Sequence, residues 1–411
     1  MIKRRSLWSK SFFAFLCVGF IIAFIVTACG PKAPERESIR IGFSTSLTGI
    51  YAAASDSKLN AIILWSEQVN AKGGIYVKDI GRNLPVKLVY YDDKSSTEEC
   101  IRIYERLITV EKVDLLFSPW GTTLNMALVP TVEKYKAPLI GTTTCALKLK
   151  GLDIKYYWSV TKDRADTQMP ALVGLLSANK DKISKVAVLY IHDVYPMTNE
   201  TCLMPLLKEK GFDVVVHKDY PLGVTDLSGV LLEIKGKNLD AVLGLSYPAD
   251  YFLMQKQAME IGLNPKIFYG LIGPGCDAFP SIFGPATEGV CFQASWNEKH
   301  PYPGAKEFYD SYVKRWNKAP DYLDSAETYE GLQILEKAIE DAGTLDWKKI
   351  RDVIATEVFK TINGEVYWGG TVFNQRGPSG VSQWQKGKVE LVWPREKATA
   401  ELMIPKPVWP K

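Results

Sequence analysis

The chain of 411 residues predicts an α/β fold with two doubly wound, Rossmann-like lobes, a three-crossing hinge and a ligand cleft between the lobes. Three observations predict this fold. Short apolar runs alternate with helical runs, which is typical of parallel sheets covered by helices. The alternation occurs in two successive sets, from Ile39 to Ile140 and from Lys185 to Gly270. The chain is also too long for one ordinary core and suits two domains.

The first set begins with a strand from Ile39 to Ser44 and a turn-rich loop that contains Tyr51. The helix that follows has an apolar face and ends at Gly73-Gly74, as a left-handed cap would end it. The remaining predicted elements of this set are a strand from Val86 to Tyr91, a helix from about Thr97 to Glu111, a strand at Leu115, a helix after Thr123 and a strand from Pro138 to Ile140.

The second set repeats the plan without repeating the sequence. Its predicted strands are Lys185 to Tyr190, Val214 to His217, Ala241 to Leu245 and Ile267 to Gly270, with helices after IHDVYPMTNE, near Ser228 and from SYPADY. His192 and Asp193 follow the first of these strands. Because adjacent residues after a strand point in different directions, we interpret this pair as solvated turn residues and not as a catalytic pair.

The last part of the chain is rich in helices. We expect helices from Ala305 to Trp316, Ser325 to Ala342 and Trp347 to Thr356, then strands at Val372-Phe373 and Val381 to Gln385. The helices should complete the first lobe and the strands should return to the second. The first lobe is thus predicted to comprise residues 39–159 and 295–369, and the second 160–294 and 370–411. Hinges are expected at the crossings near Trp158 to Thr161, Gln293 to Ser295 and Gly369 to Asn374.

Residues 1–28 predict a signal peptide, because four basic residues precede an apolar run from Phe12 to Val26. The run ends at Val-Thr-Ala-Cys29-Gly, which resembles a bacterial lipobox. This resemblance implies cleavage before Cys29, acylation of that cysteine and residues 29–38 as a tether. The protein would then be extracytoplasmic and lipid-anchored to the bacterial cell membrane, in the periplasm or on the outer cell surface. An uncleaved signal anchor is the alternative.

The remaining composition excludes several classes of function. Without the four basic residues of 1–28 the chain has 46 basic and 46 acidic residues, so it has no electrostatic signature of nucleic-acid binding. Five cysteines remain beyond Cys29, and Cys276 and Cys291 are the first pair that we would expect to form a disulfide. Three scattered histidines predict no metal site, and no cofactor is expected. The absence of GxSxG, P-loop and GxGxxG motifs argues against an enzyme.

The stretch LLFSPWGTT, from Leu115 to Thr123, predicts a strand that passes directly into a helix. The first N–H groups of a helix lack partners and can bind a carboxylate beside the threonine hydroxyls. Trp120 could then cover the apolar part of the ligand. The alternative is that a threonine caps the helix and Trp120 belongs to the core. A second threonine-rich loop, Thr142 to Thr144, follows the next strand, and both loops should reach one crevice.

The order and spacing of these segments resemble the Leu/Ile/Val-binding family of solute-binding proteins that serve ABC importers. The likeness runs from about Ile39 to Trp393 through IRIGFSTSLTG, LWSEQVNAKGGI, LVYYDDKSS, APLIGTTT, KVAVLYIHDVY, LDAVLGLSYPADY and ETYEGLQILEKAIEDAG. The resemblance implies a class I periplasmic-binding fold. It also implies a protein that closes on a small solute and presents it to a membrane permease and its ATPase. We expect a monomer.

The resemblance also implies a set of ligand-binding residues. The carboxylate of the ligand would be held by the first-lobe loops, and second-lobe tyrosines would close over the ligand. Cys145 takes a place that is commonly threonine in relatives, and Tyr51 or its neighbour Ala54 would contact the ligand from the first strand-to-helix loop. The predicted ligand-binding residues are Tyr51, Trp120, Gly121, Thr122, Thr123, Thr142, Thr143, Thr144, Cys145, Tyr195, Tyr247 and Ile272.

One departure from the family concerns the amine of the ligand. Relatives that bind α-amino acids often have a carboxylate after the strand Ile267 to Gly270, where this chain has Leu271 and Ile272. A buried ammonium without a counter-charge is costly. We therefore expect a solute that is not an α-amino acid, such as a carboxylate or an amide, or an amine that is held differently, with Asp277 as one substitute. A sensor module that reports to a membrane receptor, or a two-lobed enzyme with dispersed residues, is the alternative function.

Overall fold

The computed structural model describes residues 36–377 and 379–410. The predicted signal peptide, the predicted acylation site Cys29 and most of the predicted tether lie outside these described residues. The described residues from 39 to 410 form one compact unit. Among the described residues, every helix is too short or too polar to cross a membrane.

Lobe 1 is our name for the part of the fold built on a three-stranded parallel sheet. The sheet has the order β4-β1-β5, with β1 (Ile39–Thr45) between β4 (Val86–Asp92) and β5 (Leu115–Leu116). Ile41 of β1 lies beside Leu88 and Leu115 in the register. A separate parallel pair consists of β6 (Leu139–Gly141) and β7 (Tyr157–Ser159).

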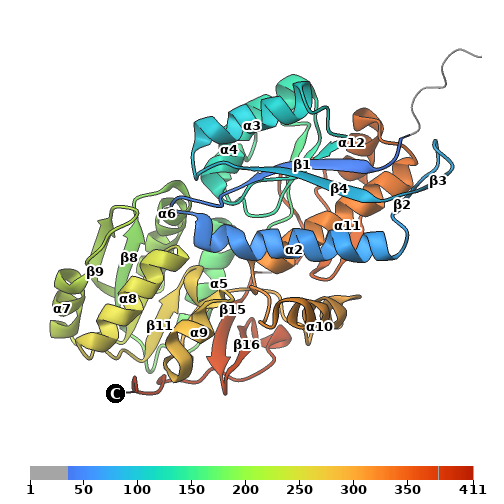
Figure 1. Ribbon diagram of the computed structural model, residues 1–411. Helices are drawn as coiled ribbons and strands as arrows, with labels where there is room; N and C mark the ends of the chain where they lie inside the picture. Colours follow the sequence, from blue (N-terminus) through green and yellow to red (C-terminus); the bar gives the residue numbers. More distant parts are fainter. Residues whose placement is uncertain (1–35, 378, 411) are drawn as a thin grey trace, which may run out of the picture. The chain divides into compact units, whose positions relative to one another are not determined.

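Helices cover both faces of this sheet. In Figure 1, α3 (Thr97–Thr109) and α4 (Thr122–Tyr135) lie on one side of β1 and β4, and α2 (Ala52–Ala71) and α11 (Asp324–Ala342) lie on the other. The last helix of this lobe, α12 (Trp347–Thr356), packs on α11. The predicted end of α2 is confirmed, because Gly73 and Gly74 follow it with positive φ angles of 94° and 95°.

Lobe 2 is our name for the part built on a seven-stranded sheet. Its order is β16-β15-β12-β11-β10-β8-β9, in which only β15 and β16 run antiparallel to their neighbours. The strands are β8 (Lys185–Ile191), β9 (Asp213–Tyr220), β10 (Ala241–Leu245), β11 (Ile267–Gly270), β12 (Cys291–Gln293), β15 (Val381–Gln385) and β16 (Lys388–Trp393). The helices are α5 (Ala165–Ser177), α6 (Val194–Glu209), α7 (Ser228–Gly236), α8 (Pro248–Glu260) and α9 (Phe279–Phe283).

The remaining elements are short or lie where the lobes meet. Helix α10 (Ala305–Trp316) packs beside α2, and Arg315 pairs with Glu67 across that contact at 3.0 Å. Two hairpins that the sequence did not predict are β2 (Ile75–Val77) with β3 (Arg82–Leu84), and β13 (Phe359–Thr361) with β14 (Gly364–Val366). The 3₁₀ turns are η1 (Leu147–Leu149), η2 (Gly273–Gly275), η3 (Gly284–Thr287) and η4 (Arg395–Lys397).

The structure brings the three predicted crossings together. The amide of Ser159 donates to Val372 O at 2.8 Å, and the amide of Asn374 donates to Ser159 O at 3.1 Å. The predicted strand at Val372-Phe373 is wrong, because only a single bridge, Ser159 to Phe373, forms there. The lobe boundaries that we predicted by residue number stay a prediction.

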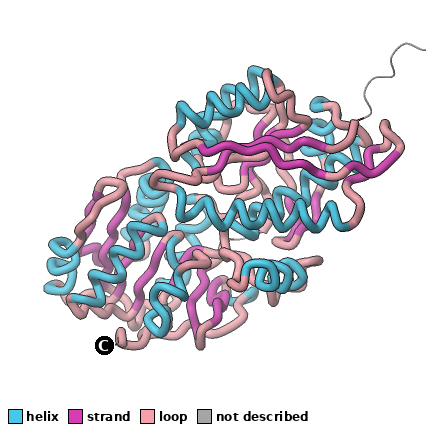
Figure 2. Tube along the Cα trace, in the orientation of Figure 1, coloured by secondary structure: helices cyan, strands magenta, loops and turns pink. Residues whose placement is uncertain are grey.

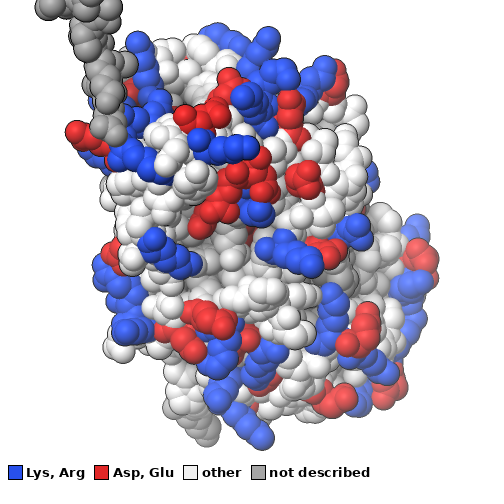
Figure 3. All heavy atoms as spheres, turned by 90° about the vertical axis from the view of Figure 1, so that its right-hand side faces the viewer, with Lys and Arg blue, Asp and Glu red and all other residues white. Residues whose placement is uncertain are grey.

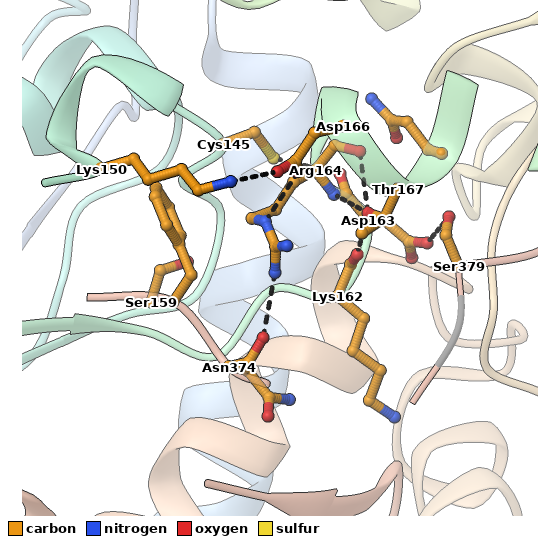
Figure 4. Close-up of polar contacts among 12 residues, drawn as sticks. Cys145, Lys150, Ser159, Lys162, Asp163, Arg164, Asp166, Thr167, Asn374 and Ser379 are labelled. Carbon is orange, nitrogen blue, oxygen red and sulfur yellow. Dashed lines mark hydrogen bonds and ion pairs between the residues drawn. The ribbon is translucent and has the colours of Figure 1, made fainter. Parts of the chain in front are cut away.

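Asp163 lies just after the first crossing and contacts both the second crossing and the segment that follows the third. Its carboxylate accepts hydrogen bonds from Gln293 Nε2 at 2.7 Å, from Ser295 Oγ at 3.0 Å and from Ser379 Oγ. Figure 4 shows the contact with Ser379, and beside it the guanidinium of Arg164, which donates to Asn374 O at 2.9 Å. One buried side chain at the start of α5 therefore ties together the segments that pass between the lobes.

The expected disulfide between Cys276 and Cys291 is absent, because both residues are free thiols. Each thiol has a different neighbour: Cys276 lies beside the carboxyl of Asp321, and Cys291 lies beside Gln383 in the sheet. Burial raises the pKa of both thiols, which keeps them protonated.

The strands of the two sheets form separate groups, each flanked by helices (Figure 2). On the face that Figure 3 presents, basic and acidic side chains are interspersed. Among the described residues, some charged side chains pair along one helix, such as Lys306 with Asp310 at 2.7 Å and Lys348 with Asp352 at 2.8 Å. Such exposed pairs contribute little to stability.

Candidate ligand-binding site

A cavity lies between the two lobes. Lobe 1 contributes the loops after β5 and β6 and the start of α11, and lobe 2 contributes the starts of α6 and α8 and the loop after β11. Of the predicted residues, those that line the cavity are Trp120, Gly121, Thr122, Thr143, Cys145, Tyr195, Tyr247 and Ile272. The lining residues that the sequence did not predict are Thr161, Asp163, Leu323, Asp324 and Glu327.

The junction between β5 and α4 has the geometry that the sequence predicted. Gly121 has a φ of 88°, a conformation that glycine adopts without strain, and α4 begins at the next residue, Thr122. The first N–H groups of α4 therefore have no intrahelical acceptor and lie at the positive end of the helix dipole. This end of the cavity suits a carboxylate.

Two threonine hydroxyls are fixed beside this helix start by backbone amides. The amide of Gly121 donates to Thr143 Oγ1 at 2.8 Å, and the amide of Cys145 donates to Thr122 Oγ1 at 3.2 Å. A hydroxyl that accepts one hydrogen bond still has its hydrogen to donate. Both hydroxyls can therefore donate to a ligand carboxylate in the cavity.

Thr142 and Thr144, which we also predicted as ligand-binding residues, do not line the cavity. The hydroxyl of Thr142 accepts from Lys58 Nζ at 2.7 Å, and that of Thr144 accepts from the Tyr157 hydroxyl at 2.6 Å. Because consecutive residues in an extended segment point to opposite sides, Thr143 alone of the three is directed to the cavity.

The ammonium of Lys58 forms hydrogen bonds with both threonine loops. Its ammonium also donates to Pro119 O at 3.0 Å and to Ser118 Oγ at 3.1 Å, and the side chain is completely buried. Burial lowers the pKa of Lys58 to about 7. The sequence contained a signal for this residue that we missed. Lys58 shares the i, i+3, i+4, i+7 face of its helix with Ala61, Ile62 and Trp65, so it belongs to the buried face.

Aromatic side chains from both lobes enclose the cavity. The ring centroid of Trp120 lies 5.6 Å from that of Tyr247, in an edge-on arrangement, and 5.2 Å from that of Tyr51. The indole Nε1 of Trp120 donates to Asp324 Oδ2 at 2.8 Å, which fixes the orientation of the ring. Tyr51 does not itself line the cavity, but packs behind Trp120.

Asp193 joins the lobes, and our interpretation of it as a solvated turn residue is wrong. Its carboxylate caps α6 by accepting from the Val194 amide at 2.7 Å. It also accepts from the hydroxyls of Tyr247 at 2.8 Å, Thr123 at 3.1 Å and Tyr51 at 3.2 Å. Because Tyr51 and Thr123 belong to lobe 1, Asp193 holds the lobes together beside the cavity. Thr123 has this role instead of lining the cavity.

The other two predicted residues of lobe 2 that line the cavity are Tyr195, which has a hydroxyl group, and Ile272, which is apolar. The Tyr195 hydroxyl lies 2.9 Å from Gln168 Nε2, and Ile272 presents a buried aliphatic side chain. Cys145 of lobe 1 donates from its thiol to Asp163 O at 3.2 Å. Burial raises the pKa of this thiol well above its ordinary value, so that it remains protonated.

Three buried carboxyl groups, Asp163, Asp324 and Glu327, also line the cavity. Burial raises the pKa of all three, and for Asp324 it raises the pKa to about 6. Glu327 Oε2 accepts from Thr161 Oγ1 at 2.6 Å. Glu327 lies on the same helical face as the apolar residues Ile334 and Ala338. An acidic residue on that face was a signal in the sequence that we did not use.

A family model described as "Periplasmic binding protein" matches residues 38–388. The chain is 26% identical to "Leu/Ile/Val-binding protein homolog 7" of Brucella suis, over 94% of this chain and 99% of that protein.

Solved structures show the same fold. The leucine binding protein LivK from Thermotoga maritima has a TM-score of 0.72 at 23% identity, and the match covers 86% of this chain and 97% of that one. LivJ from Streptococcus pneumoniae, in complex with isoleucine, has a TM-score of 0.74 at 22% identity, with 90% and 100% covered. A solute binding protein from R. palustris, in complex with benzoate, has a TM-score of 0.75 at 16% identity, with 90% and 98% covered. The two-lobed fold that the sequence predicted is confirmed.

Proposed function

From the premise that the chain belongs to the periplasmic binding protein family, we propose that it is the extracytoplasmic solute-binding lipoprotein of an ABC importer. It captures a small amino-acid-like solute, or another carboxylate or amide, when the lobes close. It then delivers the solute to a membrane permease. The observation that carries this proposal is the cavity, because residues from both lobes line it and a ligand there contacts both.

The carboxylate half of the proposed site is the start of α4 with the hydroxyls of Thr122 and Thr143. A carboxylate is common to isoleucine and benzoate, the ligands named for two of the similar structures. In this chain the apolar part of the solute lies against Trp120, Tyr247 and Ile272. Desolvation of these side chains provides a favourable free energy of about 25 cal/mol for each Å² of apolar surface buried.

Native mass spectrometry tests the proposal directly. Protein purified without denaturation should carry a small solute, and calorimetry with that solute should show one site for each chain. Trp120→Ala should weaken binding strongly because it removes one wall of the cavity, whereas Tyr76→Ala, at an exposed position of β2, should not. Equal affinity of the two variants would place the site elsewhere.

The anchor and the partner need their own tests. Wild-type protein should fractionate with membranes and lack residues 1–28, whereas Cys29→Ser should retain them. Loss of solute uptake on deletion of the permease, with solute binding unchanged, supports delivery to an importer. If uptake persists and a membrane receptor loses its response instead, the protein serves as a sensor module.

A further inference from the structure

The side of the cavity formed by lobe 2 has no acidic residue where the loop after β11 reaches it. Ile272 occupies that wall and is 5% exposed. Acidic residues instead enter from lobe 1, at the start of α11, where Asp324 and Glu327 both line the cavity. Two of the three carboxyl groups that line the cavity therefore come from lobe 1, and the third, Asp163, is already paired with Gln293, Ser295 and Ser379.

Glu327, Asp321 and Glu298 each have one buried carboxylate oxygen without a partner among the described residues, and of the three only Glu327 lines the cavity. Its side chain is 3% exposed, and Oε2 accepts from Thr161. Among the described residues, no hydrogen-bond donor reaches its buried Oε1. An unsatisfied buried carboxylate oxygen is costly, so it indicates a donor that is supplied from outside the chain.

The helix dipole does not explain this arrangement. Acidic residues are favoured in the first turn of a helix, but an exposed side chain serves that purpose. The next acidic residue of the helix, Glu330, is also buried, and both of its oxygens are satisfied by the chain. Oε1 accepts from Thr361 Oγ1 at 2.9 Å, and Oε2 accepts from Asn363 Nδ2 at 3.1 Å. A buried glutamate of this helix can therefore be fully paired, and Glu327 is not.

We propose that Glu327 binds a cationic amine of the solute, with Asp324 as the neighbouring negative charge, and that the ligand is therefore an amine-bearing molecule such as a small amino acid. The amine lies at the start of α11, and a carboxylate on the same solute lies at Thr122 and Thr143. Glu327 thus takes the role that the sequence left vacant at Ile272. This inference rests on the proposed function, because it concerns the solute of that same cavity.

Matched probes separate the amine from the rest of the solute. L-leucine, 4-methylpentanoate and 3-methylbutylamine share one apolar chain and differ in the amine and the carboxylate. L-phenylalanine, 3-phenylpropanoate and 2-phenylethylamine form a second set with an aromatic chain. Calorimetry on the full chain should show that removal of the amine weakens binding at least 10-fold in the set that fits.

The variant Glu327→Gln keeps the shape of the side chain and removes its charge. This variant should bind the amine-bearing probes at least 10-fold more weakly than the wild type does. Its affinity for the probes that lack the amine, 4-methylpentanoate and 3-phenylpropanoate, should change by less than threefold. The matched control is Glu330→Gln, one turn further along α11, which should leave every affinity within twofold. Melting temperatures of both variants report whether the fold is retained.

Proton release provides a second readout, which a purely structural role would not change. The ionisable groups that face Glu327 are Asp163, Asp324, Glu330, Lys58 and Cys145. A cation that binds a protonated carboxyl displaces its proton, so calorimetry at pH 7 in two buffers of different ionisation enthalpy should detect release. Glu327→Gln should reduce it.

Three results would overturn the inference. Tighter binding of the desamino acid than of the amino acid would refute it while leaving the solute-binding role intact. Unchanged affinity of Glu327→Gln for an amine-bearing probe would do the same. If none of the six probes binds and the purified protein carries a solute without an amine, the inference fails and the proposed function stands; if the purified protein carries no solute either, both fail.

Discussion

The hydroxyl of Tyr51 in lobe 1 donates to Oδ2 of Asp193 in lobe 2 at 3.2 Å. The same carboxylate accepts from Thr123 of lobe 1 and from Tyr247 of its own lobe. The contacts with Tyr51 and Thr123 cross between the lobes, whereas the contact with Tyr247 and the cap that Asp193 provides to α6 lie within lobe 2. Asp193 therefore stabilises the closed form relative to an open one.

Removal of one contact between the lobes should weaken solute binding without unfolding either lobe. Tyr51→Phe keeps the ring against Trp120 and removes the hydrogen bond, which contributes about 1 kcal/mol to closure. We expect the Kd of the bound solute to rise about fivefold in calorimetry. Tyr76→Phe, on the exposed face of β2, serves as the control and should match the wild type. An unchanged Kd in Tyr51→Phe would show that the contact does not favour closure.

Neighbouring threonines of one loop should respond differently to the same substitution. Thr143→Val removes a hydroxyl that lines the cavity, and a hydrogen bond to a charged group contributes about 1.5–3 kcal/mol. We expect affinity for a carboxylate-bearing solute to fall about 10- to 100-fold. Thr144→Val breaks the contact with Tyr157 and should lower the melting temperature instead. Equal effects of the two variants on Kd would contradict the assigned geometry.

Lys58 should make the stability of the solute-free protein depend on pH. Its pKa is about 7 in the folded state and about 10.5 when unfolded. Between these values the unfolded state binds more protons, so the free energy of unfolding should rise with pH, by up to about 1.4 kcal/mol per unit. Urea unfolding at pH 7 and pH 9 measures this slope.

The free energy of unfolding should change less with pH in Lys58→Met than in the wild type. Lys87→Met, at an exposed position of β4, should show the same change with pH as the wild type. Comparison with these two variants separates Lys58 from the other groups that titrate in this range. Identical slopes in all three proteins would show that Lys58 does not change its protonation on unfolding.

Binding of an amine-bearing solute should weaken as the pH falls below about 6. Burial raises the pKa of Asp324 to about 6, and a cation favours the ionised form. Below that pH a proton must leave before the amine binds, so affinity should fall by up to tenfold for each unit. Calorimetry with L-leucine from pH 7 to pH 5 measures the fall. Asp324→Asn retains a hydrogen-bond acceptor for Trp120 and should make the affinity depend less on pH. An affinity that increases at low pH would contradict this prediction.

The sequence predicted most of the fold because the apolar patterns are local. Helix α10 has the predicted bounds, Ala305–Trp316, and the strands Ile267–Gly270 and Val381–Gln385 are confirmed. The hairpin β2–β3 was missed, since its strands have three residues each and Tyr76 is exposed, which leaves little periodicity to detect. The strand predicted at Val372-Phe373 fails because only Phe373 finds a strand partner, Ser159.

Half of the site could be predicted and half could not. The loops at Thr122 and Thr143 follow strands of one lobe, and parallel strands bring such ends together. Asp324 and Glu327 come from a helix far along the chain, and only the packing of α11 against lobe 1 brings them to the cavity. Asp193 was misjudged for a related reason: its partners Tyr51 and Thr123 belong to the other lobe, and nothing near it in the sequence indicates them.

Asp163 lines the cavity and also holds the segments that connect the lobes. A solute bound as we propose would therefore lie beside the group that joins the hinge segments, so its size would set the angle between the lobes. A permease that contacts both lobes would then distinguish the filled protein from the empty one without contact with the solute.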